Sequence, residues 1–300
     1  MITGAAGFAG TYLATACAAA GDEVTALPRA ACDLLDADAA RAAVAAARPD
    51  VVHHLAARAH VGESWRDPAG TLRDNVAMTL NLLEAVRAEA PGATVVAVAS
   101  GEVYGTPETL PIREDAPLRP QNPYAVSKAS ADLLAGFYAD AHGLRIIRAR
   151  AFNHAGPGQA DTYAISSFAR QVAEGAGRIV TGNPDTRRDY TDVRDVVRAY
   201  RLLAERAAPG VYNVCSGRAV STAELVRALG AEHEVDPARL RPHEVMELRG
   251  SCEALRAATG WEPEIPLERT LSETVAYWRD APARGRTAVP RPGRDRSPRP

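Results

Sequence analysis

Short apolar runs alternate with longer amphipathic stretches along the first half of the 300-residue chain. Runs of about four to eight apolar and β-branched residues indicate buried strands, and apolar positions at helical spacing indicate helices. Strands that alternate with helices form a parallel sheet with right-handed crossovers, so we expect a doubly wound α/β fold. The pattern predicts strands at 22–27, 50–55, 94–99 and 144–150, with helices near 8–20, 37–48, 71–90 and 122–142.

The pattern is less regular after residue 150, and we expect this part to form a smaller C-terminal lobe that closes over the sheet. Ser221 and Glu224 have the spacing of a capping box, which marks the start of a helix. Pro266 suits the first turn of another helix. The elements predicted here are a strand at 211–214 and helices near 162–175, 192–206, 222–229 and 267–279.

Composition and charge exclude several classes of protein. A chain with 46% hydrophobic and 24% charged residues is typical of a globular protein. No apolar run reaches the roughly 18 residues of a membrane span, and Met1 leads directly into a glycine turn without a secretory segment. The Pro- and Arg-rich segment 281–300 is expected to be disordered. The net charge is −2 with this basic segment included, so the body is acidic, which argues against a nucleic-acid partner.

The cysteines and histidines do not have the spacing of a metal site. The four cysteines form no C-x-x-C pair, which favours reduced thiols in a cytoplasmic protein. His53 and His54 are adjacent on a predicted strand, so they face opposite sides of the sheet. We therefore predict no metal, and we expect His154 to be a hydrogen-bonded pocket residue.

Three glycines stand where the first strand meets the first helix. Gly4, Gly7 and Gly10 form the pattern G-x-x-G-x-x-G. Side chains there would block the tight turn and the approach of backbone N–H groups to a pyrophosphate. This loop, with Phe8 and Ala9, is therefore a candidate dinucleotide site. Only three residues precede it, fewer than the usual five or so of a strand. Either the first strand is short, which would weaken the domain, or it begins upstream of Met1, which is the interpretation we favour.

The residues that follow the second and third strands bear on which dinucleotide binds. Arg29 follows the second strand with no acid beside it, and a positive charge there suits the 2′-phosphate of NADP. If Arg29 is only a solvated loop residue, NAD remains possible. We favour NADP(H), with NAD(H) as the alternative. The other candidates for contact with the adenosine and ribose are Asp33, Leu34, Leu55, Ala56 and Ala57.

Lys128 is the only lysine in the chain, whereas the other 34 basic residues are arginines. A lysine that persists in such a composition indicates a position where arginine cannot replace it. Tyr124 lies one helical turn before it on the same face. An ammonium group there would lower the pKa of the Tyr124 phenol and allow proton exchange near neutral pH. Ser100, at the end of the fourth strand, could hold the same substrate oxygen.

With the glycine loop, Ser100 and the Y-x-x-x-K pair in register, the chain resembles the extended short-chain dehydrogenase/reductase family, also called the NAD-dependent epimerase/dehydratase family. The resemblance covers residues 1 to about 280. It implies a Rossmann-type dinucleotide-binding domain at 1–150 with segments returning from about 178–215, a mainly nucleotide-sugar-binding lobe at 151–280, and a homodimer. Four stretches are similar to the branch of the family that reduces GDP-4-dehydro-6-deoxy-D-mannose: RAFNHAGPGQ (150–159), RDYTDVRD (188–195), VYNVCSG (211–217) and RGSC (249–252).

This resemblance implies roles for individual residues. Tyr124 would donate a proton to the oxygen at C4, Ser100 would hold that oxygen, and Lys128 would hold the nicotinamide ribose. Asn153 would contact the diphosphate or the sugar. A planar guanidinium group suits paired hydrogen bonds to phosphate. The substrate site would therefore also include Arg188 and Arg249 as a diphosphate clamp, together with Gly101 and Ser251.

Glu102 keeps other reactions open. In related 4,6-dehydratases a glutamate at this place removes the C5 proton, but Gly101 stands where the dTDP-sugar enzymes have an aspartic acid. We therefore predict NAD(P)H-dependent reduction of the C4 ketone, giving GDP-D-rhamnose. A GDP-mannose-type 4,6-dehydratase or a nucleotide-sugar 4-epimerase with tightly bound cofactor is the alternative. A non-catalytic dinucleotide-binding sensor is a remote one, since such proteins typically lose the tyrosine or the lysine.

Overall fold

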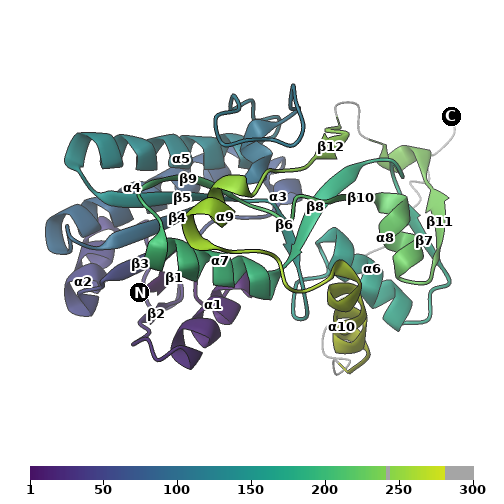
Figure 1. Cartoon of the computed structure of the whole chain (residues 1–300), viewed down its shortest axis with the longest axis horizontal. Helices are drawn as coiled ribbons and strands as arrows, with labels where there is room; N and C mark the ends of the chain where they lie inside the picture. Colours follow the sequence, from purple (N-terminus) through teal and green to yellow (C-terminus); the bar gives the residue numbers. More distant parts are fainter. Residues whose placement is uncertain (241–243, 281–300) are drawn as a thin grey trace, which may run out of the picture.

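A parallel sheet of six strands forms the centre of the larger lobe in the computed structural model, which describes residues 1–240 and 244–280 (Figure 1). The strand order is β2-β1-β3-β4-β5-β9, and every neighbouring pair is parallel. This topology confirms the doubly wound α/β fold. The strands are β1 (Ile2–Thr3), β2 (Ala26–Leu27), β3 (Val51–His54), β4 (Thr94–Ser100), β5 (Arg145–Ala151) and β9 (Gly210–Val214).

Helices cover both faces of this sheet, as the right-handed crossovers require. One face carries three helices that pack side by side: α2 (Ala37–Ala47), α4 (Pro68–Glu89) and α5 (Pro123–His142). The other face carries α1 (Phe8–Ala19) and α7 (Val193–Arg206), with α9 (Glu253–Thr259) against α7. Two short helices, α3 (Val61–Ser64) and the 3₁₀ turn η1 (Gly101–Tyr104), follow β3 and β4.

Side chains local to each helix start explain where the long helices begin. Asp67 accepts a hydrogen bond from the backbone N–H of Gly70, so α4 begins a few residues before the predicted 71. Asn122 caps α5 in the same way through the N–H of Ala125, and Pro123 occupies the first position. The capping box of Ser221 and Glu224 is confirmed, with both of its hydrogen bonds present.

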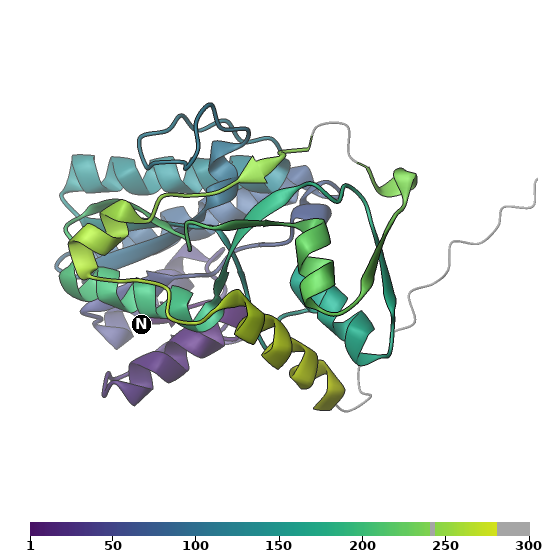
Figure 2. The same ribbon diagram turned by 45° about the vertical axis from the view of Figure 1, so that its right-hand side comes forward.

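The smaller lobe is built around β8 (Arg187–Asp192) (Figure 2). This strand lies between β10 (Ala219–Ser221) and β12 (Glu247–Leu248), and it also pairs with β6 (Asn153–Ala155). A second, two-stranded sheet joins β7 (Arg178–Thr181) to β11 (Glu232–Val235). The helical elements of this lobe are α6 (Ala164–Ala173), α8 (Thr222–Ala228), η2 (Pro237–Arg239) and α10 (Leu267–Asp280), with α10 packed against α6.

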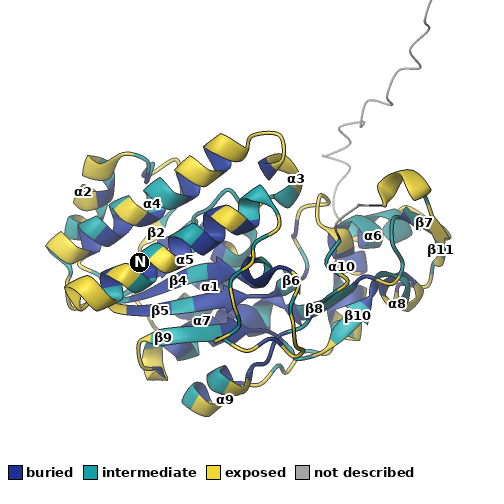
Figure 3. Cartoon of the chain, turned by 90° about the horizontal axis from the view of Figure 1, so that it is seen from above, coloured by how far each residue is buried: buried dark blue, intermediate teal, exposed yellow. Residues whose placement is uncertain are grey.

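Three hydrophobic clusters hold these layers together. Two lie on either side of the six-stranded sheet, and their helices turn buried faces inward and exposed faces outward (Figure 3). The third cluster fills the space between α6, α8 and α10 in the smaller lobe. Within the described part of the chain, no helix is long and apolar enough to cross a bilayer.

The structure corrects two expectations about strands. The predicted strand 22–27 is paired only at Ala26 and Leu27, because its partner β1 offers only Ile2 and Thr3. The short strands of the smaller lobe, β8 among them, were not predicted, because they do not alternate cleanly between apolar and polar residues. The expected disorder of 281–300 lies outside the described residues.

Candidate active site

A cavity of about 620 Å³ lies where the carboxyl ends of the central strands meet the smaller lobe. This is the edge at which open parallel sheets bind ligands. Apart from Tyr124 and Lys128, eleven residues are predicted to contact the dinucleotide. All of them line this cavity: Gly4, Gly7, Phe8, Ala9, Gly10, Arg29, Asp33, Leu34, Leu55, Ala56 and Ala57. The wall also contains Ser100, Glu102, Tyr124, Lys128 and Asn153, whereas Gly101, Arg188, Arg249 and Ser251 do not contribute to it.

The glycine loop has no room for side chains. Gly4 has a φ of +69°, and a Cβ on it would lie 2.8 Å from the backbone nitrogen of Ala56. A Cβ on Gly10 would lie 2.2 Å from the carbonyl oxygen of Gly4. The loop can therefore pass close to β3 and lead directly into α1, whose first residues line the cavity. Such a bare backbone at a helix N-terminus fits the pyrophosphate of a dinucleotide.

Tyr124 and Ser100 meet at the cavity wall. Tyr124 lies in the first turn of α5, and Ser100 is the last residue of β4. Burial raises the pKa of the Tyr124 phenol well above its usual range, and a hydrogen bond with Ser100 offsets this only in part. Like an ordinary tyrosine, this side chain is a neutral phenol near pH 7 and has a proton to donate.

Lys128 is not among the groups that shift the pKa of Tyr124 in this structure, so its effect on the phenol stays a prediction. Its Nζ donates a hydrogen bond to the backbone carbonyl oxygen of Val98 at 2.5 Å. Burial lowers the pKa of Lys128 to about 8, and Asp132 opposes this shift. The desolvation of Tyr124 thus dominates its pKa, while Lys128 presents a partly desolvated amine to the same cavity.

Glu102 is held beside the start of α5. The side-chain amide of Asn122 donates to a carboxylate oxygen of Glu102 at 3.2 Å, while the amide oxygen of Asn122 caps the helix. The backbone N–H of Glu102 donates to Ser100 Oγ at 3.2 Å. These bonds connect the turn after β4 to the helix that carries Tyr124.

Gly101 leaves no place for an acidic side chain in this turn. A Cβ on Gly101 would lie 2.9 Å from the ring of Phe152, closer than real Cβ contacts allow. Phe152 is buried and forms part of the cavity wall, so the ring fills the position toward which a side chain at 101 would point.

The register of the smaller sheet shows which predicted substrate residues face the cavity. Asn153 pairs with Tyr190, and Leu248 pairs with Arg188. Paired residues on neighbouring strands point to the same face, and both Asn153 and Leu248 line the cavity. Arg188 and Tyr190 therefore point to the side of this sheet on which the cavity lies, although neither residue is part of the cavity wall. Burial raises the pKa of Tyr190, and the nearby charges of Arg188 and Glu102 lower and raise it, respectively.

Arg249 and Ser251 lie elsewhere in this lobe. The Nε of Arg249 donates to a carboxylate oxygen of Glu247 at 2.8 Å, which holds its side chain on the face opposite Leu248. The backbone N–H of Ser251 donates to the carbonyl oxygen of Ile112. The structure thus brings Arg188 to the cavity side but does not bring Arg249 beside it.

Arg29 lies at the open rim of the cavity with 75% of its side chain exposed. The sequence placed no acid next to it, but Asp33, four residues later in the same loop, approaches its guanidinium group at 3.4 Å. An ion pair this exposed is weak, so the guanidinium remains available to a phosphate.

Several lining residues were not predicted. Tyr163 and Arg58 come from loops that give no signal in the sequence, and Gln159 holds its loop through a hydrogen bond to the carbonyl oxygen of His154. His154 stacks parallel to Phe8 at 6.1 Å between ring centroids, and its Nδ1 is hydrogen-bonded to the carbonyl oxygen of Phe152. Burial lowers the pKa of His154, so it lines the site as a neutral ring.

The histidines on β3 are structural. His54 lies between the hydroxyls of Thr3 and Thr79, and burial lowers its pKa to about 3. His53 is buried as well, with a pKa also lowered to about 3. Over residues 1–240 and 244–280, no three His, Cys, Asp or Glu side chains are grouped so that they could hold a metal ion.

Comparison with known proteins agrees with this architecture. Residues 1–215 match the family described as the NAD dependent epimerase/dehydratase family. The chain belongs to this family. It is 41% identical over 292 residues to GDP-6-deoxy-D-mannose reductase of Pseudomonas aeruginosa, covering 92% of this chain and 96% of that protein. It is 30% identical to UDP-glucose 4-epimerase of Mycolicibacterium smegmatis, over 93% of this chain and 98% of the relative.

Solved structures of family members superpose on it closely. RMD from Pseudomonas aeruginosa complexed with NADPH has a TM-score of 0.84 at 38% identity, covering 93% of this chain and 98% of that one. UDP-glucose 4-epimerase of Thermus thermophilus in complex with NAD has a TM-score of 0.85 at 32% identity, with the same coverage.

We predict that Gly10→Ala destabilises the protein by about 1–3 kcal/mol, because its Cβ would overlap backbone atoms of the turn. The distorted turn should weaken NADPH binding at least about tenfold, a loss of about 1.4 kcal/mol. Fluorescence titration and thermal unfolding measure both effects. Gly92→Ala is the matched control, since no atom lies within 4 Å of its added methyl group. Equal behaviour of the two variants would contradict the steric account of the loop.

Proposed function

We propose that the protein is an NAD(P)H-dependent oxidoreductase that reduces the C4 ketone of GDP-4-dehydro-6-deoxy-D-mannose to GDP-D-rhamnose. The observation that carries this proposal is that Tyr124, Ser100 and Lys128 line one cavity together with the glycine loop. The 41% identity to GDP-6-deoxy-D-mannose reductase supports the choice of ketone and nucleotide.

The residues divide the work of a carbonyl reduction. A bound dinucleotide supplies the hydride for C4. Tyr124 donates its proton to the oxygen at C4, and the Ser100 hydroxyl holds that oxygen in place. Fixed donors of this kind stabilise the charge that develops on the oxygen, commonly the largest single contribution to the rate. We assign Lys128, one turn further along α5, to the nicotinamide ribose.

The contact between Phe152 and Gly101 favours reduction over dehydration. Elimination of water from the sugar needs a proton donor for the leaving hydroxyl as well as a base. Glu102 could serve as the base, but the ring of Phe152 closes the space at Gly101 where an acid would stand. We therefore propose that Glu102 assists substrate binding in this protein.

We propose that the lobes divide the ligands between them. Residues 1–150, with segments returning from about 178–215, would hold the dinucleotide, and residues 151–280 mainly the nucleotide sugar. The cavity lies between these parts and is lined by both. The sugar would lie near Asn153, with the diphosphate extending toward Arg188. Within the described residues Arg188 makes no ion pair with an acidic side chain, so its charge is free for an anion.

We also propose a cytoplasmic homodimer. All four cysteines are free and buried, which fits a reducing compartment. Leu133 and Phe137 on α5 are 59% and 58% exposed, and Leu72 and Leu80 on the neighbouring helix α4 are exposed as well. Exposed apolar side chains on adjacent helices favour a protein interface.

Replacement of Tyr124 by Phe should lower kcat at least about 100-fold, because it removes the proton donor. The assay follows NADPH oxidation with GDP-4-dehydro-6-deoxy-D-mannose, and the NADPH dissociation constant should change little. Tyr212→Phe is the control, since this hydroxyl bonds to the carbonyl oxygen of Ala208 outside the cavity. A Tyr124→Phe variant that retains more than a tenth of the wild-type kcat would refute the assignment.

Replacement of Arg29 by Ala should raise KM for NADPH about tenfold and leave KM for NADH within twofold, because only NADPH carries the 2′-phosphate. Steady-state kinetics with each cofactor give both values. Arg41→Ala, which removes a similarly exposed arginine from α2, should change neither. An equal rise for both cofactors would mean that Arg29 does not recognise the phosphate.

The double variant Leu133→Glu with Phe137→Glu should be a monomer, since four charges would face one another across a two-fold interface. Light scattering after size-exclusion chromatography gives the mass. Val235→Glu places a charge at another exposed apolar position, on β11, and should leave the dimer intact. A monomeric wild type, or a dimeric double variant, would rule out this interface.

A further inference from the structure

The motif at 188–195 contains three buried aspartates, and Asp189 differs from the other two. Asp192 forms an ion pair with Arg194, and Asp195 forms one with Arg198. Asp189 is fully buried, and within the described residues it has no cationic partner. Burial raises its pKa to about 6, although hydrogen-bond donors hold the pKa down. A buried carboxylate without a cation is costly, so its donors must compensate.

Four hydrogen bonds to the Asp189 carboxylate come from two distant segments. The backbone N–H and the hydroxyl of Ser216 donate at 2.8 and 2.6 Å, and the N–H of Gly217 donates at 2.9 Å. The N–H of Gly250 adds a longer bond of 3.4 Å. Gly217 has a φ of +79°, a conformation that suits glycine and lets this turn present successive N–H groups to one carboxylate.

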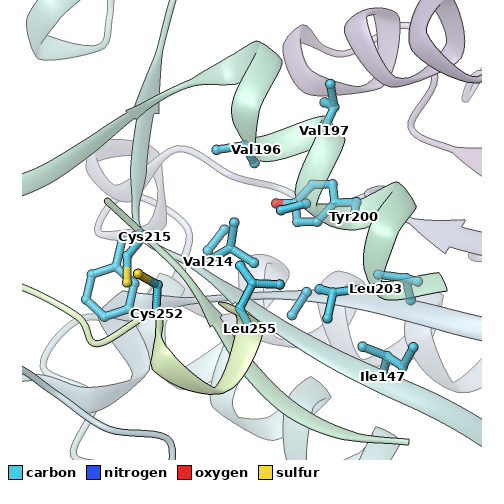
Figure 4. Close-up of a cluster of buried hydrophobic side chains, with 14 of the residues drawn as sticks. Ile147, Val196, Val197, Tyr200, Leu203, Val214, Cys215, Cys252 and Leu255 are labelled. Carbon is cyan, nitrogen blue, oxygen red and sulfur yellow. The ribbon is translucent and has the colours of Figure 1, made fainter. Parts of the chain in front are cut away.

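These donors belong to the junction between the lobes. Ser216 and Gly217 follow directly after β9 at the edge of the six-stranded sheet, whereas Asp189 is on β8 of the smaller sheet. The two donor segments also pack against each other, since the side chains of Cys215 and Cys252 lie next to one another beneath the turn (Figure 4). Asp189 therefore connects the substrate lobe to the dinucleotide lobe at one buried point.

Asp189 also lies between the two residues of β8 that face the cavity side. Side chains alternate along a strand, so Arg188 and Tyr190 point to the opposite face from Asp189. A bond that holds Asp189 to the end of β9 thus sets where Arg188 and Tyr190 stand relative to Ser100, the last residue of β4 in the same sheet as β9. If the sugar of a nucleotide diphosphate sugar lies near Ser100, the rest of the molecule must span the distance from Ser100 to Arg188 for the diphosphate to contact the guanidinium group.

We propose that Asp189 is a positioning residue for the binding of the nucleotide diphosphate. Its hydrogen bonds hold β8 to the turn after β9, and they thereby keep Arg188 and Tyr190 where the substrate can contact them. This inference rests on the proposed function. Asp189 itself does not contact the substrate. Loss of its carboxylate should weaken nucleotide binding, while the dinucleotide site on the other lobe keeps its affinity.

Replacement of Asp189 by Asn tests this proposal. The shape is kept, but an NH₂ group replaces one acceptor oxygen and cannot accept from Gly217 or Gly250. We expect the dissociation constant for GDP, measured by calorimetry with the NADPH-bound protein, to rise about tenfold. KM for the ketone substrate should rise similarly, whereas the dissociation constant for NADPH should stay within twofold.

Asp195→Asn is the matched control. Asp195 is also buried, and one of its carboxylate oxygens accepts the N–H groups of Glu264 and Ile265 at 2.9 and 2.8 Å. This variant should lose thermal stability to a similar degree but keep the wild-type affinity for GDP. Equal GDP affinities for Asp189→Asn and wild type, or an equal loss of GDP affinity in both variants, would show that Asp189 is merely structural and overturn the proposal.

Ser216→Ala decides the question if Asp189→Asn does not fold. It removes only the hydroxyl bond to Asp189, so GDP affinity should fall about threefold with NADPH affinity unchanged, and unchanged GDP affinity overturns the proposal. A wild-type protein that neither binds GDP nor reduces the ketone would overturn the proposed function itself. A wild type that does both, together with an unaffected Asp189→Asn variant, would overturn only the present inference.

Discussion

The contact between the first turns of α5 and the carboxyl end of β4 is the constraint on which the site depends. It places the half-buried Tyr124 beside Ser100 and directs the amine of Lys128 to the carbonyl oxygen of Val98. Asn122 secures this contact by capping α5 while binding Glu102 in the turn after β4. A tyrosine phenol is protonated near neutral pH, and a protonated phenol is the state that a reductase requires.

Buried polar groups also determine how the second lobe meets the first. The three aspartates of the motif at 188–195 each bind backbone or side-chain donors far away in the sequence. Asp192 reaches Thr270 on α10, and Asp195 reaches the segment before that helix. Because hydrogen bonds are directional, the bonds of Asp189 to Ser216 and Gly217 fix how β8 meets the end of β9 more narrowly than apolar packing alone would. The bonds of Asp192 and Asp195 instead hold α10 and the segment before it.

Local signals in the sequence indicated most of the helices and strands of the larger lobe, but not the sheet of the smaller one. The glycine loop, the capping box of Ser221 and Glu224 and the single lysine depend on residues close together in the chain, and each lies where it was predicted. The strand Arg187–Asp192 is mostly polar and acquires its neighbours from residues 153 and 248, so no periodicity indicated it. For the same reason the sequence could not tell that Arg188 and Arg249 face different sides, nor that Phe152 closes the space at Gly101.

Transfer of a labelled hydride tests the central claim most directly. The protein would be supplied with NADPH that carries deuterium on the transferable position of the nicotinamide, together with GDP-4-dehydro-6-deoxy-D-mannose. The account predicts one deuterium at C4 of a GDP-6-deoxyhexose with the D-rhamno configuration, and one oxidised cofactor released for each sugar formed. A sugar product without deuterium, or conversion without net consumption of NADPH, would contradict it and indicate a dehydratase or an epimerase.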